Sequence, residues 1–167
     1  MEISLVPLRE SPQDASHALT WALDLWGDHF PNYSRQDWFD FYSNSTQSNY
    51  ESWIGEGQEL VYIAKRGHEI VGTIALVDFD ELEEFRHFKP WIAAFIVNPD
   101  FRGTGVGTQI LALLEIQAQV LGIKVLHLWT EDHSAFYSKR GYQLVASAKL
   151  GELDICVMRK ELALNCN

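Results

Sequence analysis

The alternation of apolar and polar residues divides the chain into short strand-like and helical segments. A two-residue period marks a first strand within residues 2–9, and a helical period follows from Ser11, which is typical of an N-cap with proline at the first helical position. A second helix is predicted from Ser34, where Asp37 is placed to complete a capping box. The remaining apolar segments predict, in order, strands 60–64, 70–77 and 91–97, a helix 105–121, a strand 125–130, a short helix 132–139, and strands 142–148 and 153–159.

Turn residues separate these segments. Residues 65–68 are typical of a hairpin turn, and Gly122 and Gly141 are placed to end two of the helices. The resulting order, β-α-α-β-β-β-α-β-α-β-β, combines hairpins with one β-α-β crossover. It predicts an α/β fold of the α+β type, with a mixed sheet, packed helices and a single domain spanning residues 1–167.

The connection formed by residues 78–89 is long for a link between two strands. Its apolar residues recur every three positions, which would allow a short helix covering a cleft. It also carries five acids, and beside a cleft these would attract an ammonium group; a solvated acidic loop is the alternative. The acids are Asp78, Asp80, Glu81, Glu83 and Glu84.

Composition is that of a globular protein, with 47% hydrophobic and 22% charged residues. The formal net charge of −10 argues against nucleic acid or an anionic membrane as the main partner and is compatible with a cationic one. No apolar run approaches the roughly 18 residues of a membrane span, and the N-terminus lacks a secretory-signal pattern. Cys156 and Cys166 show neither metal nor disulfide spacing, and the histidines lack ligand spacing, so a reduced, cytoplasmic protein without a metal is expected.

The clearest chemistry lies in residues 96–108, where an apolar strand runs into a glycine-rich turn and then a helix. Glycines let backbone N–H groups converge, and the helix N-terminus adds a positive partial charge, so a phosphate is the natural ligand. The spacing fits neither a dinucleotide fingerprint, which needs glycine where Thr108 stands, nor a Walker loop, which ends in Gly-Lys-Ser/Thr. A glycine turn without a ligand remains the alternative at this point.

A second motif, within residues 126–142, makes the assignment more specific. Together the two motifs resemble the GNAT family of N-acetyltransferases, which carries Gln/Arg-x-x-Gly-x-Gly/Ala after its fourth strand and aromatic-Tyr-x-x-x-Gly-Tyr/Phe after its fifth. The matching residues are Arg102, Gly105 and Gly107 in the first motif and Phe136, Tyr137, Gly141 and Tyr142 in the second. The order of elements is also that of the family, and residues 90–93 resemble a bacterial branch whose substrates are mostly unassigned.

The resemblance implies acetyl-CoA as co-substrate, bound where the fourth and fifth strands splay apart. The turn amides would hold the pyrophosphate with help from Arg102, and the strand end would pair with the pantetheine and polarise the thioester. The implied donor-binding residues are Ile96, Val97, Arg102, Gly103, Thr104, Gly105, Val106, Gly107, Thr108 and Ser134. Tyr137 matches the family's general acid, since a phenol stays protonated at neutral pH and can donate to the departing thiolate; a core tyrosine is the alternative.

The general base and the acceptor stay open. Some family members carry a glutamate on the fourth strand, but residues 91–95 contain no carboxylate. The candidate bases are Asp78, Asp80 and Glu131, followed by Asp132, His133 and His87, and an amine that arrives neutral would need none. The expected activity is acetyl transfer to a primary amine of a small molecule or peptide. An acyl-CoA sensor without turnover and an acetyltransferase of protein N-termini or lysines are the alternatives, and exposed aromatics would allow a homodimer.

Overall fold

The computed structural model describes residues 1–163 and shows the predicted order of strands and helices. The strands are β1 (Ile3–Pro7), β2 (Glu59–Arg66), β3 (Glu69–Val77), β4 (Trp91–Val97), β5 (Val125–Thr130), β6 (Gln143–Leu150) and β7 (Leu153–Glu161). The helices are α1 (Ala15–Trp26), α2 (Arg35–Ser45), α3 (Val106–Val120) and α4 (Ser134–Ser138). Within the described residues the strands form one sheet in the order β1-β2-β3-β4-β5-β7-β6, in which β4 and β5 run parallel and the other neighbours antiparallel. The predicted mixed sheet is therefore confirmed.

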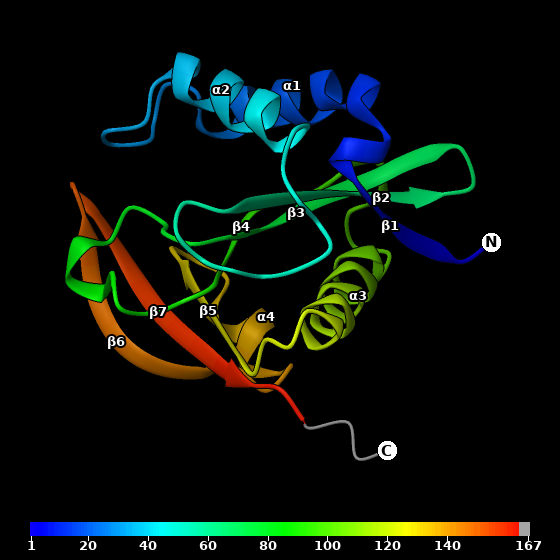
Figure 1. Cartoon of the computed structure of the whole chain (residues 1–167). Coiled ribbons are helices and arrows are strands. Elements are labelled where there is room, and N and C mark those ends of the chain that lie inside the picture. The colour runs from blue at the N-terminus through cyan, green and yellow to red at the C-terminus, as the bar shows by residue number, and fades with distance from the viewer. Residues whose placement is uncertain (164–167) are drawn as a thin grey trace.

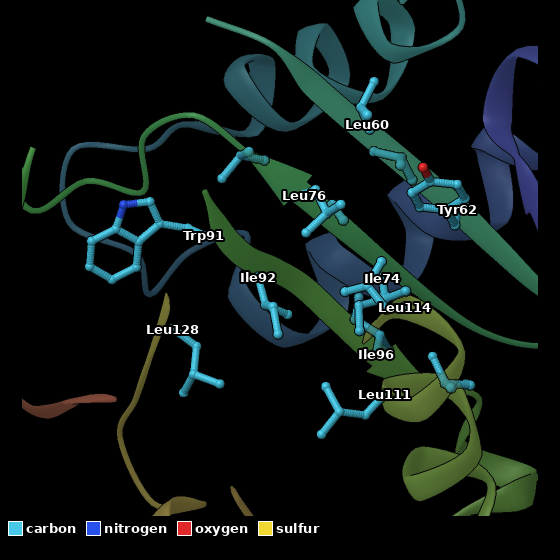
Figure 2. Packing of buried hydrophobic residues seen from close by; sticks show 14 of the residues in the cluster. Leu60, Tyr62, Ile74, Leu76, Trp91, Ile92, Ile96, Leu111, Leu114 and Leu128 are labelled. Atoms are coloured by element: carbon cyan, nitrogen blue, oxygen red, sulfur yellow. The ribbon is translucent and has the colours of Figure 1, made fainter. Parts of the chain in front are cut away.

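Helices cover both faces of the sheet. Figure 1 shows α1 and α2 on one face and α3 on the other. The apolar stripe of α3 is buried against the strands, and Gly72 of β3 allows the close approach, because a Cβ there would lie 2.6 Å from Cδ1 of Ile110. Figure 2 shows Leu111 and Leu114 of α3 within the same cluster as Ile74 of β3.

Two predicted helix signals are confirmed. Ser34 and Asp37 form a reciprocal capping box, with the Asp37 N–H donating to Oγ of Ser34 at 3.1 Å and the Ser34 N–H donating to Oδ2 of Asp37 at 2.7 Å. Gly122 ends α3 with a φ of +78°, while the Ile123 N–H donates to the carbonyl of Ala118 at 2.9 Å. These bonds satisfy backbone groups that a helix end leaves free.

One local prediction was wrong in detail. Ser11 does not cap α1, because a 3₁₀ turn (Pro12–Asp14) intervenes and its hydroxyl donates to the Asp14 carboxylate instead. That carboxylate also pairs with Lys65 at 2.6 Å, so the serine belongs to a buried polar network. Residues 78–89 contain one 3₁₀ turn (Glu83–Phe85), so the short helix that their three-residue period allowed is present as a single turn.

Membrane-spanning helices and metal sites can be assessed within residues 1–163. No helix there is both long and apolar enough to span a bilayer, and no group of three His, Cys, Asp or Glu side chains is placed to hold a metal ion. Cys156 is a free thiol, and Cys166 lies outside the described residues.

Candidate active site

The glycine-rich turn joins β4 to α3. Asn98 anchors it, since its Nδ2 donates to the carbonyl of Ile70 at 2.9 Å and its Oδ1 accepts from the Asp100 N–H at 3.1 Å. Gly103 and Gly105 have φ values of +75° and +84°, which other residues rarely adopt. A Cβ at either position would meet nothing within 4 Å, so backbone conformation, and not crowding within the chain, requires glycine here.

Backbone amides at the start of α3 are free to bind an anion. The Gln109 N–H donates to the carbonyl of Gly105 at 3.2 Å, and the amides of residues 106–108 precede this bond and have no helical acceptor. Val106 is fully buried in the core, whereas Arg102 and Thr108 are exposed. Amides of this kind, together with the helix dipole, are suited to binding an anion.

Strands β4 and β5 pair at one position and then separate. Trp91 is the register partner of His127, whose N–H donates to the carbonyl of Pro90 at 3.1 Å. Closer to the turn, the register with β3 shifts and Ala94 has a φ of +47°. The hydroxyl of Thr73 on β3 donates to the Ala94 carbonyl at 3.4 Å, so the Phe95 N–H of the same trans peptide points away from that hydroxyl. The predicted separation of the two strands is confirmed.

Tyr137 lies on α4, between two aromatic rings. Its ring centroid is 5.1 Å from that of Phe136 and 5.7 Å from that of Tyr142, with edge-on geometry in both cases. Burial raises the pKa of Tyr137 to about 12, so the phenol stays protonated across the neutral range. Phe136 in turn lies near β4 and the first turn of α3, since its ring is 6.4 Å from that of Phe95 and 3.9 Å from the place of a Cβ at Gly107.

Arg140 is a residue that the sequence motifs did not single out. Its Nη1 donates to the carbonyl of Phe136 at 2.6 Å, and its Nε donates to the hydroxyl of Thr108 at 3.2 Å. The guanidinium also lies 3.7 Å from the centroid of the Phe136 ring. Arg140 therefore connects the helix that carries Tyr137 to the first turn of α3.

Asp78, a candidate base, is engaged in structural contacts. Its Oδ2 accepts from the Gly57 N–H at 2.8 Å, and Nζ of Lys89 lies 3.0 Å from its Oδ1. Burial on its own would raise the pKa of Asp78, but the hydrogen bond from Gly57 and the charge of Lys89 lower it. A carboxylate with a low pKa accepts a proton weakly, so this environment disfavours a base at Asp78.

Two other carboxyl groups are better matched to neutral pH. Burial raises the pKa of Asp80 to about 7, and the charge of Glu81 acts in the same direction. The indole N–H of Trp129 donates to the backbone carbonyl of Asp80 at 3.1 Å, which places Asp80 at the end of β5. Glu59, the first residue of β2, also has its pKa raised to about 7 by burial. Sequence reasoning missed Glu59 because nothing distinguishes it from an ordinary strand terminus.

These acids gather around Tyr33, in the connection between α1 and α2. Burial raises the pKa of Tyr33, and four carboxylates raise it further: Glu59, Glu81, Asp37 and Asp80. The ring of Phe30 from the same connection lies 5.4 Å from that of Trp129. We refer to Tyr33, Glu59, Asp80, Glu81 and Trp129 as the acidic–aromatic wall. Since β5 ends at Thr130 and α4 begins at Ser134, the chain passes directly from this wall to the helix of Tyr137.

The remaining candidate residues have varied surroundings. Glu131 is exposed between β5 and α4, Ser134 is the first residue of α4, and Ile96 is buried. Trp91 is fully buried in the core. Burial lowers the pKa of His127, which stacks on Phe88 at 4.6 Å, so this histidine is neutral and part of the junction between β4 and the 78–89 segment.

Comparisons with known proteins agree with this geometry. The family model described as the acetyltransferase (GNAT) family matches residues 21–142. The chain is 32% identical over 88 residues to the aminoalkylphosphonate N-acetyltransferase of Salmonella typhimurium, covering 48% of this chain and 54% of that protein. It is 36% identical over 52 residues to the amino-acid acetyltransferase of Azotobacter vinelandii, covering 31% of this chain and 12% of that protein. The chain thus spans about half or less of these relatives.

Solved structures share the fold at low identity. An aminoglycoside 6'-N-acetyltransferase complexed with coenzyme A superposes with a TM-score of 0.70 at 16% identity, covering 100% of both chains. An acetyltransferase from Salmonella typhimurium with its cofactor acetyl-CoA gives 0.64 at 17% identity, covering 100% of this chain and 96% of the other. A GNAT-family protein from Desulfovibrio desulfuricans gives 0.69 at 16% identity, covering 97% and 100%. With the family model matching most of its length, the chain belongs to the acetyltransferase (GNAT) family.

Proposed function

We propose that this chain is an acetyl-CoA-dependent N-acetyltransferase that moves the acetyl group directly to a primary amine, with Tyr137 as the general acid. The observation that carries the proposal is the opening between β4 and β5, which has free amides at one end and the helix of Tyr137 beside it. Structural neighbours that contain CoA or acetyl-CoA support the choice of donor.

The residues of the turn fit a pyrophosphate. The amides of residues 106–108 point out of α3, and Arg102 adds a fixed positive charge that is exposed to solvent. Acetyl-CoA supplies a thioester, whose thiolate is a good leaving group. The Phe95 N–H and the strand end at Ile96 and Val97 would donate to the carbonyl oxygen that gains negative charge.

Tyr137 supplies the acid in this scheme. A thiol has a pKa of about 8.5, so its thiolate leaves readily and needs little more than a hydrogen bond as charge develops. The Tyr137 hydroxyl, protonated because its pKa is about 12, can donate that bond throughout the neutral range. The burial of its ring between Phe136 and Tyr142 limits the directions in which the hydroxyl can point.

The acidic–aromatic wall favours a cationic amine as acceptor. Its carboxylates attract an ammonium group, and its rings can hold the attached carbon chain. Asp80 is the preferred base, because a pKa of about 7 lets it accept the ammonium proton at neutral pH. Glu59 has the same pKa and would either hold a second cationic group or act as a second base.

The acceptor end of the site favours a small molecule over a protein chain. A Cβ at Gly151, in the β6–β7 turn, would lie 2.8 Å from Cγ of Pro31 in the α1–α2 connection. The two connections therefore touch, and Figure 1 shows them at the same edge of the molecule. This contact disfavours a groove open at both ends, which a protein substrate needs.

The test is thiol release from acetyl-CoA with a panel of amines. The panel contains simple diamines, amino acids, aminoalkylphosphonates, aminoglycosides and peptides with acidic or neutral N-termini. We expect the fastest turnover with amines that carry a second positive charge. Binding of CoA without turnover on any amine would instead support a sensor, and a preference for peptides would support the protein acetyltransferase.

A further inference from the structure

A partly buried polar network lies behind Tyr137. It joins Glu115 of α3, Tyr142 at the start of β6 and Lys160 of β7. The Tyr142 hydroxyl donates to Oε1 of Glu115 at 3.0 Å, and Nζ of Lys160 donates to Oε2 at 2.9 Å. The side chains of Lys160 and Glu115 are 25% and 18% exposed, and Tyr142 is 3% exposed. Both oxygens of this carboxylate are thus used inside the protein.

Stability alone is a weak reason for such a network. Taking a carboxylate and an ammonium group out of water costs about as much as their attraction returns, and packed hydrophobic residues often serve equally well. Glu115 also lies outside both the glycine-rich turn and the acidic–aromatic wall. We therefore ask whether the network acts on a neighbouring residue.

The neighbour of functional interest is Tyr137. The Tyr142 ring packs edge-on against the Tyr137 ring at 5.7 Å, and the Tyr142 N–H donates to the Tyr137 carbonyl at 3.2 Å. Tyr142 is thus held at both ends, by Tyr137 at its backbone and by Glu115 at its hydroxyl. Since α4 has only five residues, its position depends on contacts of this kind more than on its own hydrogen bonds.

We propose that Glu115 is a positioning residue: acting through Tyr142, it holds Tyr137 in the orientation from which the hydroxyl reaches the sulfur of the donor. This inference rests on the proposed function of Tyr137. Glu115 belongs to α3, the helix whose first turn provides the proposed anion site. The network therefore fixes the position of the Tyr137 hydroxyl relative to the bound donor. Lys160 holds the carboxylate in place through its contact with Oε2.

The experiment compares two substitutions of the same residue. Glu115→Leu removes the acceptor for the Tyr142 hydroxyl, whereas Glu115→Gln keeps an oxygen in that place. We expect Glu115→Leu to lower kcat about tenfold, since small displacements of a catalytic group cost this much or more. KM for acetyl-CoA should stay within about twofold, and Glu115→Gln should keep at least about half of kcat. Glu152→Leu, which removes an exposed acid in the β6–β7 turn, is the matched control and should behave as wild type.

The Tyr137→Phe background separates positioning from general destabilisation. With no hydroxyl to orient, Glu115→Leu should cause no further loss of kcat. The same loss in both backgrounds, or wild-type kcat in Glu115→Leu, overturns the proposal. If Glu115→Leu does not fold, Tyr142→Phe serves in its place, because it keeps the Glu115–Lys160 pair. It should lower kcat about threefold and only while Tyr137 is present, and wild-type kcat would overturn the proposal.

A readout without substrate distinguishes this inference from the proposed function. In protein labelled with ¹³C-tyrosine, the ring signals of Tyr137, assigned through Tyr137→Phe, should shift in Glu115→Leu and stay in place in Glu115→Gln and Glu152→Leu. Unchanged signals in Glu115→Leu overturn the positioning role even if no amine is acetylated. Wild-type turnover in Tyr137→Phe would overturn the acid role, and the positioning role with it.

Discussion

Tyr137 is the residue on which the proposed chemistry depends most directly. Replacing it by phenylalanine keeps the ring packed between Phe136 and Tyr142 and removes only the hydroxyl. We expect kcat to fall about 10²-fold, a usual contribution of a general acid, with KM for acetyl-CoA within about twofold. Steady-state thiol-release kinetics measure both constants. Unchanged turnover across the pH range would remove Tyr137 as the acid.

Asp80 and Asp78 differ in environment, and their variants should differ in pH profile. With Asp80 as base, kcat/KM rises as the pH passes through about 7, because the carboxyl group loses its proton there. Asp80→Asn should remove this rise, and Asp78→Asn should keep it, since the pKa of Asp78 is already low. If kcat/KM still rises through pH 7 in Asp80→Asn, another group is the general base, and Glu59 is the next to test.

Gly105 tests the anion site. Gly105→Glu places bulk and negative charge in front of the free amides of α3, and it should abolish binding of CoA measured by calorimetry. Gly122→Glu is the matched control, because Gly122 also has a positive φ, +78° against +84°, and open space for a Cβ at the other end of the helix. Both variants should lose about 1–2 kcal/mol of stability from the left-handed backbone, and the control should still bind CoA. Binding retained by Gly105→Glu would mean that the donor phosphate lies elsewhere.

Sequence motifs could point to candidate donor residues but not to candidate acceptor residues. The candidate donor residues are local, since one continuous turn contains the amides and the second motif contains Tyr137. The acidic–aromatic wall is assembled from distant segments, with Glu59 on β2, Tyr33 before α2 and Asp80 after β3. No spacing along the chain encodes that proximity, and the same holds for Glu115, which reads as one polar residue on an amphipathic helix.

At the level of elements, short-range signals predicted most boundaries. The capping box at Ser34 and the glycine after α3 act through backbone bonds to near neighbours, so the local sequence suffices. Ser11 shows the limit of such signals. Its hydroxyl binds Asp14 and Lys65 and does not cap α1, and Lys65 is far away in sequence. The 78–89 segment is similar, since its conformation depends on the Asp78–Lys89 ion pair and on contacts with β5.

The connections that carry Asp80 and Glu59 should make stability depend on pH. Both carboxyl groups have their pKa raised to about 7, from 3.8 and 4.5, so the folded state holds these protons more tightly than the unfolded chain. The stabilising contribution is full below the unfolded pKa values and is lost as the pH rises through about 7. We therefore expect the free energy of unfolding, measured with urea, to fall between about pH 5.5 and about pH 8.

Asp80→Asn should make that dependence shallower, because the amide cannot ionise. Asp78 and Asp14 act in the opposite sense, because their lowered pKa values contribute stability that is lost only as the pH falls well below the usual range of a carboxyl group. His127, whose pKa is also lowered, opposes the fall near its own titration range, but it is one group against Asp80 and Glu59. A free energy of unfolding that rises from about pH 5.5 to about pH 8 would contradict the assigned environments of Asp80 and Glu59.

For the whole molecule, binding of the donor should stabilise the fold markedly. A ligand at about 100 times its Kd adds about 2.7 kcal/mol, which for a chain of this length raises Tm by roughly 5–10 °C. Thermal unfolding with and without acetyl-CoA measures the shift, and Gly105→Glu should abolish it while Gly122→Glu retains it. No shift in the wild-type protein would contradict acetyl-CoA as the donor.

The single pairing of Trp91 with His127 has a mechanical consequence for this sheet. A sheet normally resists bending at every ladder bond, but here one half (β1 to β4) and the other (β5, β7 and β6) are joined at one end of their boundary. That boundary therefore carries few ladder hydrogen bonds, although one cluster of buried residues extends across both halves. A donor bound between β4 and β5 would supply hydrogen bonds that this boundary lacks, as an added strand does, so its binding would stiffen the sheet and its departure would loosen it.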